Sequence, residues 1–219
     1  MRGLYAITPV TLDSKQLIEQ VSRAIAGGAS VVQYRAKQLA TDLAKTQAQA
    51  LRAVTRATGT TFIINDDSEL AIAVGADGVH LGRDDGGADA IPRIRKIYAT
   101  RMPQRSFIIG LSCYNELSRA EAAVAAGADY VAFGSFFSSL TKPHALRADI
   151  SLIHAAKTRF KIPVVAIGGI TVENAPQLIA ANVDAVAVIS SLFEAEDIER
   201  RAREFTFLFQ PESHVEFHQ

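Results

Sequence analysis

The chain has 219 residues, of which 48% are hydrophobic, and this length suits one substantial core but is short for two domains. Its 23 basic residues balance its 23 acidic ones, which argues against a non-specific nucleic-acid binder, because such proteins carry excess Lys and Arg. The single cysteine, Cys113, cannot form an internal disulfide, as is typical of a reducing, cytoplasmic compartment. No signal peptide and no apolar run of membrane-spanning length is present, so we expect no membrane partner.

Eight short apolar runs alternate with longer stretches of helix-forming residues at helical spacing. The runs are continuously apolar, which is typical of parallel strands covered on both faces. In chain order we expect strands at residues 4–7, 30–34, 62–64, 78–81, 107–111, 130–133, 164–167 and 185–189. One strand and one helix per about 27 residues falls within the range for a (β/α)8 barrel.

A weak internal repeat supports this count. Similar short motifs end a helical stretch just before a strand: Ala-Gly-Gly-Ala at 26–29, Val-Gly-Ala-Asp at 74–77, Ala-Gly-Ala-Asp at 126–129 and Ala-Asn-Val-Asp at 181–184. They recur about every 50 residues, or two strand-helix units. A doubly wound open sheet is the alternative, but the first strand lacks the Gly-rich nucleotide turn of that fold. We therefore predict an α/β fold, a single-domain (β/α)8 TIM barrel over residues 1–209, with a flexible tail at 210–219.

Functional residues of such a barrel follow the strands, and the second strand is followed by cations. Alternation along the chain places Gln33, Arg35 and Lys37 on one side, where they would converge at the barrel mouth. An anion-binding site is the favoured interpretation, and a salt-bridge network with Asp or Glu is the alternative.

Carboxylates follow the third and fourth strands. Asp66 and Asp85 lie at the ends of neighbouring strands, where two carboxylates can share one Mg2+ ion and leave other positions to water and phosphate. The alternative for such an acid is a helix N-cap, and we expect Asp67 to take that role because a helical run begins at Ser68.

The remaining strand ends carry small and polar residues. Gly168 and Gly169 after the seventh strand, with Ser190 after the eighth, match the recurrent phosphate site of this fold. We expect Cys113 to be inert and His80 to be packed in the core, since neither has a catalytic motif around it. Ser112 is compatible with a ligand donor or a turn residue, and the 135–143 loop with an oxyanion site or a plain surface loop.

In order along the chain, these motifs resemble those of the thiamine phosphate synthase family. The matching segments are Gln33-x-Arg35-x-Lys37, Asn65-Asp66, Gly78-Val79-His80-Leu81-Gly82-x-x-Asp85, Ser112, Thr141-Lys142-Pro143, Ala166-Ile167-Gly168-Gly169-Ile170 and Ile189-Ser190. The resemblance covers residues 4–193. It implies a transferase that joins 4-amino-2-methyl-5-(diphosphooxymethyl)pyrimidine to a thiazole phosphate, releasing diphosphate by a dissociative, Mg2+-assisted mechanism.

The resemblance also implies roles for individual residues. The pyrimidine diphosphate would be bound by Gln33, Tyr34, Arg35, Ala36, Lys37, Asn65, Ser112 and Lys142, of which Arg35, Ser112 and Lys142 are the predicted catalytic residues. The thiazole phosphate would be bound by Ser139, Leu140, Thr141, Gly169, Ile189 and Ser190. Mg2+ would be held by Asp66 and Asp85.

Two rivals share this barrel. A thiazole tautomerase paralogue tends to lack the metal-binding Asp and to carry His at the position of Ser135, whereas this chain has Asp66 and no such His. A non-catalytic barrel that binds thiamine precursors would be expected to have lost Asp66, Asp85 or Lys142, and all three are present. The expected partners are phosphorylated small molecules, and the sequence leaves the oligomeric state open, a homodimer included.

Overall fold

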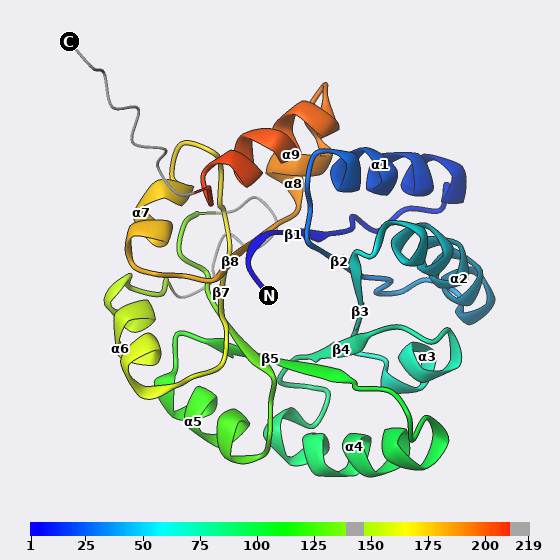
Figure 1. Ribbon diagram of the computed structural model, residues 1–219, viewed down its shortest axis with the longest axis horizontal. Helices are drawn as coiled ribbons and strands as arrows, with labels where there is room; N and C mark the ends of the chain where they lie inside the picture. Colours follow the sequence, from blue (N-terminus) through cyan, green and yellow to red (C-terminus); the bar gives the residue numbers. More distant parts are fainter. Residues whose placement is uncertain (139–146, 211–219) are drawn as a thin grey trace.

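A computed structural model describes residues 1–138 and 147–210 of the chain, and its centre is a closed barrel of eight parallel strands in the order β1 to β8 (Figure 1). The strands are β1 (Gly3–Ile7), β2 (Val31–Tyr34), β3 (Thr61–Asn65), β4 (Gly78–Leu81), β5 (Ile108–Tyr114), β6 (Tyr130–Phe133), β7 (Val164–Ile167) and β8 (Ala185–Val188). The predicted TIM barrel is confirmed.

Helices form the outer ring around these strands (Figure 1). They are α1 (Ser14–Ala26), α2 (Thr41–Thr58), α3 (Ser68–Ala73), α4 (Ala90–Arg101), α5 (Leu117–Ala125), α6 (Ser151–Arg159), α7 (Ala175–Ala180), α8 (Ser190–Phe193) and α9 (Ile198–Phe207), with a short 3-10 turn, η1 (Gly87–Asp89), before α4. No helix within the described ranges is long and apolar enough to span a membrane. Residues 211–219 lie outside these ranges, so the tail stays a prediction.

All eight expected strands are present, and the largest difference in their bounds is at β5. We expected it to end at residue 111, but it continues through Ser112 and Cys113 to Tyr114. Its pairing with β6 shifts between Ser112 and Tyr114, and Tyr114 adopts a left-handed φ of 55°. The last residues of β5 are therefore irregularly paired and partly polar, so an apolar sequence pattern does not identify them as strand.

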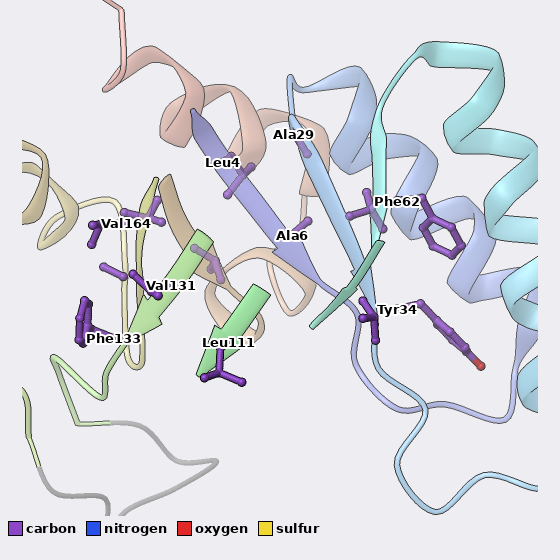
Figure 2. Close-up of a cluster of buried hydrophobic side chains, with 14 of the residues drawn as sticks. Leu4, Ala6, Ala29, Tyr34, Phe62, Leu111, Val131, Phe133 and Val164 are labelled. Atoms are coloured by element: carbon purple, nitrogen blue, oxygen red, sulfur yellow. The ribbon is translucent and has the colours of Figure 1, made fainter. Parts of the chain in front are cut away.

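The core has two layers, one inside the barrel and one between the barrel and the helices. In the outer layer, Tyr34 and Phe62 point away from their strands toward the helices (Figure 2), and the Tyr34 hydroxyl donates to Gln47 of α2 over 2.7 Å. The inner layer contains apolar side chains together with Tyr5 and Tyr130. Several of these inner side chains also line the cavity at the barrel mouth, so the inner layer packs the barrel and forms the floor of that cavity.

The repeated motifs have a structural role at the base of the barrel. Asp77, Asp129 and Asp184 each precede an even-numbered strand and accept a hydrogen bond from a backbone N–H of the preceding strand, at 2.6 to 2.9 Å. Each also pairs with a cation from an even-numbered helix: Arg52 to Asp77, Arg95 to Asp129 and Lys157 to Asp184. The repeat thus ties helix to strand and leaves the opposite end of the barrel for function.

Candidate active site at the barrel mouth

A cavity of about 880 Å3 opens at the carboxyl ends of the strands. Its described lining includes most of the predicted site residues: Gln33, Arg35, Lys37, Asn65, Asp66, Ser112, Gly169, Ile189 and Ser190. Residues that lie up to 157 positions apart in the chain therefore share one cavity, because parallel strands in a closed barrel all end at the same face.

The loop after β2 supplies two cations to the cavity. The Arg35 backbone N–H donates to Thr8 Oγ1 over 3.0 Å, which fixes the turn against the end of β1. Lys37 Nζ lies 3.1 Å from Asp66 Oδ2, whereas no ion pair within the described ranges involves Arg35. The salt-bridge alternative thus applies to Lys37, while Arg35 is available for an anion.

Tyr34 and Ala36 alternate with Arg35 and Lys37 along the chain, and they face the outer side of the barrel. They line a smaller hollow of about 480 Å3 on the outer side of the barrel, beside α2 and α3. Tyr34 is only 1% exposed. Their side chains do not line the mouth cavity, so a ligand there could reach these two residues only through the backbone.

Two carboxylates meet at the ends of β3 and β4. Asp66 has a left-handed φ of 65°, and this turn brings its carboxylate into the cavity while Asp67 caps α3 by accepting from the Leu70 N–H. Asp85 Oδ2 accepts from the Gly82 N–H over 2.8 Å. Burial raises the pKa of Asp85, and its hydrogen bond with Asp66 raises it further.

Burial is the main cause of the raised pKa of Asp85, and part of the rise comes from the neighbouring Asp66 carboxylate, so the two acids interact. A divalent cation would stabilise both charges, and an all-oxygen pair of this kind suits Mg2+, which completes its shell with water and phosphate. Within residues 1–138 and 147–210, no group of three or more His, Cys, Asp or Glu side chains could form a closed metal cage. An open site with two protein ligands is the arrangement that these residues fit.

A chain of hydrogen bonds crosses the floor of the cavity, and sequence reasoning did not foresee it. Gln33 Nε2 donates to Tyr5 Oη, and Tyr5 Oη lies 2.8 Å from Tyr130 Oη. His80 Nδ1 is 2.9 Å from Tyr130 Oη, and His80 Nε2 is 2.8 Å from Ser112 Oγ. His80 is buried, as predicted, but its ring faces the cavity rather than the apolar core.

The backbone makes room for this chain at Gly110. Gly110 pairs with Tyr130 across β5 and β6, and a Cβ atom on Gly110 would lie 1.9 Å from Cζ of the Tyr130 ring.

Burial lowers the pKa of His80 to about 4, so its imidazole is neutral at pH 7. Burial also raises the pKa of both Tyr5 and Tyr130, so both hydroxyls keep their hydrogens.

Small residues form the other side of the cavity, after β7 and β8. Gly169 has a φ of +63°, and a Cβ atom there would lie 2.3 Å from the Ser138 carbonyl oxygen. Asn174 holds this turn by donating to the Gly169 carbonyl and accepting from the Thr171 N–H, each at 2.9 Å. Ser190, the first residue of α8, lines the same cavity.

One cation on this side was missed by sequence reasoning. Arg201 of α9 lines the cavity and donates to the Ser191 carbonyl over 3.4 Å. It lies on a helix that follows the last barrel strand, so a search restricted to strand ends could not detect it.

The rim near β5 carries a stacked group. The Tyr114 ring has the guanidinium carbons of Arg83 and Arg119 at 4.7 and 5.7 Å from its centroid, and Glu116 pairs with both arginines. Cys113 beside it is fully buried, and burial raises the pKa of its thiol to about 12, in agreement with the inert role predicted for it.

Some predicted site residues cannot be placed. Ser139, Leu140, Thr141 and Lys142 lie in the segment 139–146, outside the described residues. Their assigned roles remain predictions.

The mouth thus combines cations and paired carboxylates on the β2 to β4 side with a glycine turn and a serine on the β7 to β8 side. Such an arrangement could bind two anionic groups at once, and its carboxylates could hold a divalent cation. The described residues contain no Ser-His-Asp arrangement, since the neutral His80 contacts Ser112 and Tyr130 rather than a carboxylate.

Comparison with known proteins agrees with this geometry. The family model described as thiamine monophosphate synthase matches residues 4–192. The thiamine-phosphate synthase of Methylobacillus flagellatus is 50% identical over 209 residues, covering 95% of this chain and 96% of the relative. That of Aromatoleum aromaticum is 47% identical, covering 95% and 97%.

Solved structures extend the comparison. Thiamine phosphate pyrophosphorylase from Pyrococcus furiosus superposes with a TM-score of 0.82 at 35% identity, covering 94% of this chain and 95% of that one. A 3-hexulose-6-phosphate synthase superposes at 0.68 with 18% identity, covering 96% and 100%, and this shows the shared fold alone. The expectations of a transferase and of a part in thiamine biosynthesis are confirmed. The chain belongs to the thiamine monophosphate synthase family.

Proposed function

We propose that the barrel mouth joins a pyrimidine methyl diphosphate to a thiazole phosphate, with one substrate on each side of the cavity. The observation that carries this proposal is that one cavity of about 880 Å3 contains cations on one side and a glycine turn with a serine on the other. Asp66 lies in the lining next to the cations, and Asp85 interacts with Asp66 from outside the lining. A cavity of this size accommodates two small substrates side by side.

The pyrimidine diphosphate binds on the β2 to β5 side. Arg35 and Lys37 supply positive charge for the diphosphate, and Asn65 and Ser112 supply hydrogen bonds from the ends of β3 and β5. Asp66 and Asp85 hold Mg2+, which neutralises charge on the leaving diphosphate when it is bound. Lys37 pairs with Asp66 in the structure, so Lys37 would have to leave this ion pair in order to bind the diphosphate.

The thiazole phosphate binds on the β7 to β8 side. Backbone N–H groups at Gly169 and Ser190 approach the phosphate closely because neither position carries a bulky side chain. Arg201 adds a positive charge from α9. Ser139, Leu140 and Thr141, outside the described residues, are proposed to complete this side. Lys142, also outside them, is proposed to bind the diphosphate.

Catalysis then requires positioning and charge stabilisation rather than a protein nucleophile. The carbon–oxygen bond to diphosphate breaks first, the electron pair leaves with diphosphate, and the thiazole nitrogen attacks the pyrimidine methylene cation. Arg35 and Ser112 stabilise the negative charge that develops on the leaving group. The apolar walls, including Ile167 and Ile189, limit the access of water to the cation.

The division of the cavity is tested by measuring the two substrates separately with isothermal titration calorimetry. We expect Arg35→Ala to weaken binding of the pyrimidine diphosphate at least about 10-fold and to leave thiazole phosphate binding unchanged. Arg201→Ala is expected to weaken binding of the thiazole phosphate alone, because it removes a positive charge from that side of the cavity. If each substitution weakens both substrates equally, the two-sided arrangement is wrong.

A further inference from the structure

The hydrogen-bond chain on the cavity floor has a direction that its first member sets. Gln33 Nε2 has hydrogens and no acceptor lone pair, so it can only donate to Tyr5 Oη, which lies 2.8 Å away. The Tyr5 hydroxyl hydrogen then needs an acceptor of its own because the side chain is fully buried. Tyr130 Oη, at 2.8 Å, is its hydrogen-bond partner in the structure.

The same reasoning continues to the other end of the chain. The Tyr130 hydrogen goes to His80 Nδ1, which must therefore be the unprotonated nitrogen of the ring. A neutral imidazole with an accepting Nδ1 carries its hydrogen on Nε2, and that hydrogen is donated to Ser112 Oγ over 2.8 Å. In the reverse direction the Tyr5 hydrogen would have no acceptor within the described ranges.

This direction determines what Ser112 offers to a ligand. One lone pair of its hydroxyl oxygen is occupied by His80, so its hydrogen is left for an acceptor in the cavity. A hydroxyl whose oxygen already accepts a hydrogen bond is also a stronger donor, because hydrogen bonds in a chain polarise one another.

We propose that His80 is a positioning residue for the condensation reaction, holding the Ser112 hydroxyl as a hydrogen-bond donor toward an oxygen of the leaving diphosphate. Tyr130, Tyr5 and Gln33 fix the tautomer of His80 from the other end of the chain. The identity of the ligand that Ser112 contacts rests on the proposed function. The tautomer of His80 is inferred from the free protein alone.

The first test is a double-mutant cycle in kcat. We expect Ser112→Ala to lower kcat about 100-fold and His80→Leu about 10-fold, with little change in KM for the pyrimidine diphosphate. Because His80 acts through Ser112, the double variant should be no slower than Ser112→Ala alone. A double variant slowed by the product of the two losses, about 1000-fold, would overturn the proposal.

Rescue and control variants separate positioning from packing. His80→Gln places an amide donor near the position of Nε2, so we expect it to recover most of the kcat lost in His80→Leu. Tyr130→Phe removes the donor to His80 and should lower kcat about 10-fold. Tyr98→Phe is its matched control, since Tyr98 is also buried but donates to the Ser106 carbonyl beside α4, away from the mouth. Equal kcat losses in Tyr130→Phe and Tyr98→Phe would count against the proposal.

The second test needs no catalysis and no variant that must remain active. Nitrogen-15 NMR of the histidine side chains in the free wild-type protein reports which ring nitrogen carries the hydrogen, and loss of one signal set in His80→Gln assigns it among the five histidines. We expect Nε2 to be protonated, and a protonated Nδ1 would overturn the proposal. A wild-type protein that shows this tautomer but makes no thiamine phosphate would contradict the proposed function instead.

Discussion

Lowering the pH should destabilise the protein through His80, by an amount that follows from its burial. The pKa of His80 is lowered from 6.5 to about 4 in the folded state, with burial as the main cause. Between pH 6.5 and pH 4 the unfolded chain binds a proton at this residue while the folded protein does not, so stability is lost as the pH falls. The difference between these two pKa values corresponds to about 3 kcal/mol once the pH is below both of them.

Urea unfolding at pH 7.5 and pH 4.5 measures this loss, with His80→Gln as the reference because its amide does not titrate. We expect the wild type to lose about 2 to 3 kcal/mol more than His80→Gln between these two values. The comparison is needed because the raised pKa of Asp85 acts in the opposite direction and is shared by both proteins. If the two proteins lose stability in parallel, His80 is not held neutral by burial, and the reasoning fails.

Three further predictions concern the metal site, the glycine turn and the base of the barrel. Asp85→Asn should lower Mg2+-dependent turnover about 100-fold or more, which corresponds to about 3 kcal/mol of activation free energy. Asp84→Asn, which changes the exposed neighbouring residue, should leave turnover unchanged. Equal losses in the two variants would contradict the assignment of Asp85 as a metal ligand. Gly169→Ala should weaken thiazole phosphate binding in calorimetry, because the added Cβ would meet the Ser138 carbonyl. Gly59→Ala is the control, since Gly59 has a similar φ of +71° and open space around the added Cβ. It should cost about 1 kcal/mol of stability and leave binding intact. Asp77→Ala should cost about 2 kcal/mol in urea unfolding, because it leaves the Phe62 N–H and the Arg52 side chain unpaired. Glu121→Ala, which breaks an exposed ion pair with Arg159, should cost less than about 1 kcal/mol. Similar costs for the two variants would mean that the repeated motif does not stabilise the barrel.

The sequence predicts the barrel well because its strands are continuous apolar runs, and a helix-ending motif precedes every second strand. The carboxylate that recurs in three of these motifs, as in Asp77, also ties strand to helix, so the pattern and the packing have one cause. The prediction fails at the end of β5, where Ser112, Cys113 and Tyr114 continue the strand through an irregular pairing. A mixed polar segment does not stand out as strand without its neighbours.

Part of the candidate site can be predicted from the sequence and part cannot. Residues only a few positions apart in the chain, such as Arg35 and Lys37, are visible as a motif, and the structure places both in the cavity. The chain of Tyr5, Tyr130 and His80 is not visible, because its members lie 50 to 125 residues apart and each looks like part of an ordinary apolar strand. Only closure of the barrel brings them together.

The most direct test of the whole account is product formation by the purified protein from the two phosphorylated precursors. We expect thiamine phosphate and diphosphate to appear in equal amounts by mass spectrometry when Mg2+ is present, and product to be lost when the ion is chelated and to return when it is restored. If both substrates bind with Mg2+ present and no thiamine phosphate forms, the account is contradicted, and a barrel that only binds thiamine precursors becomes the better explanation.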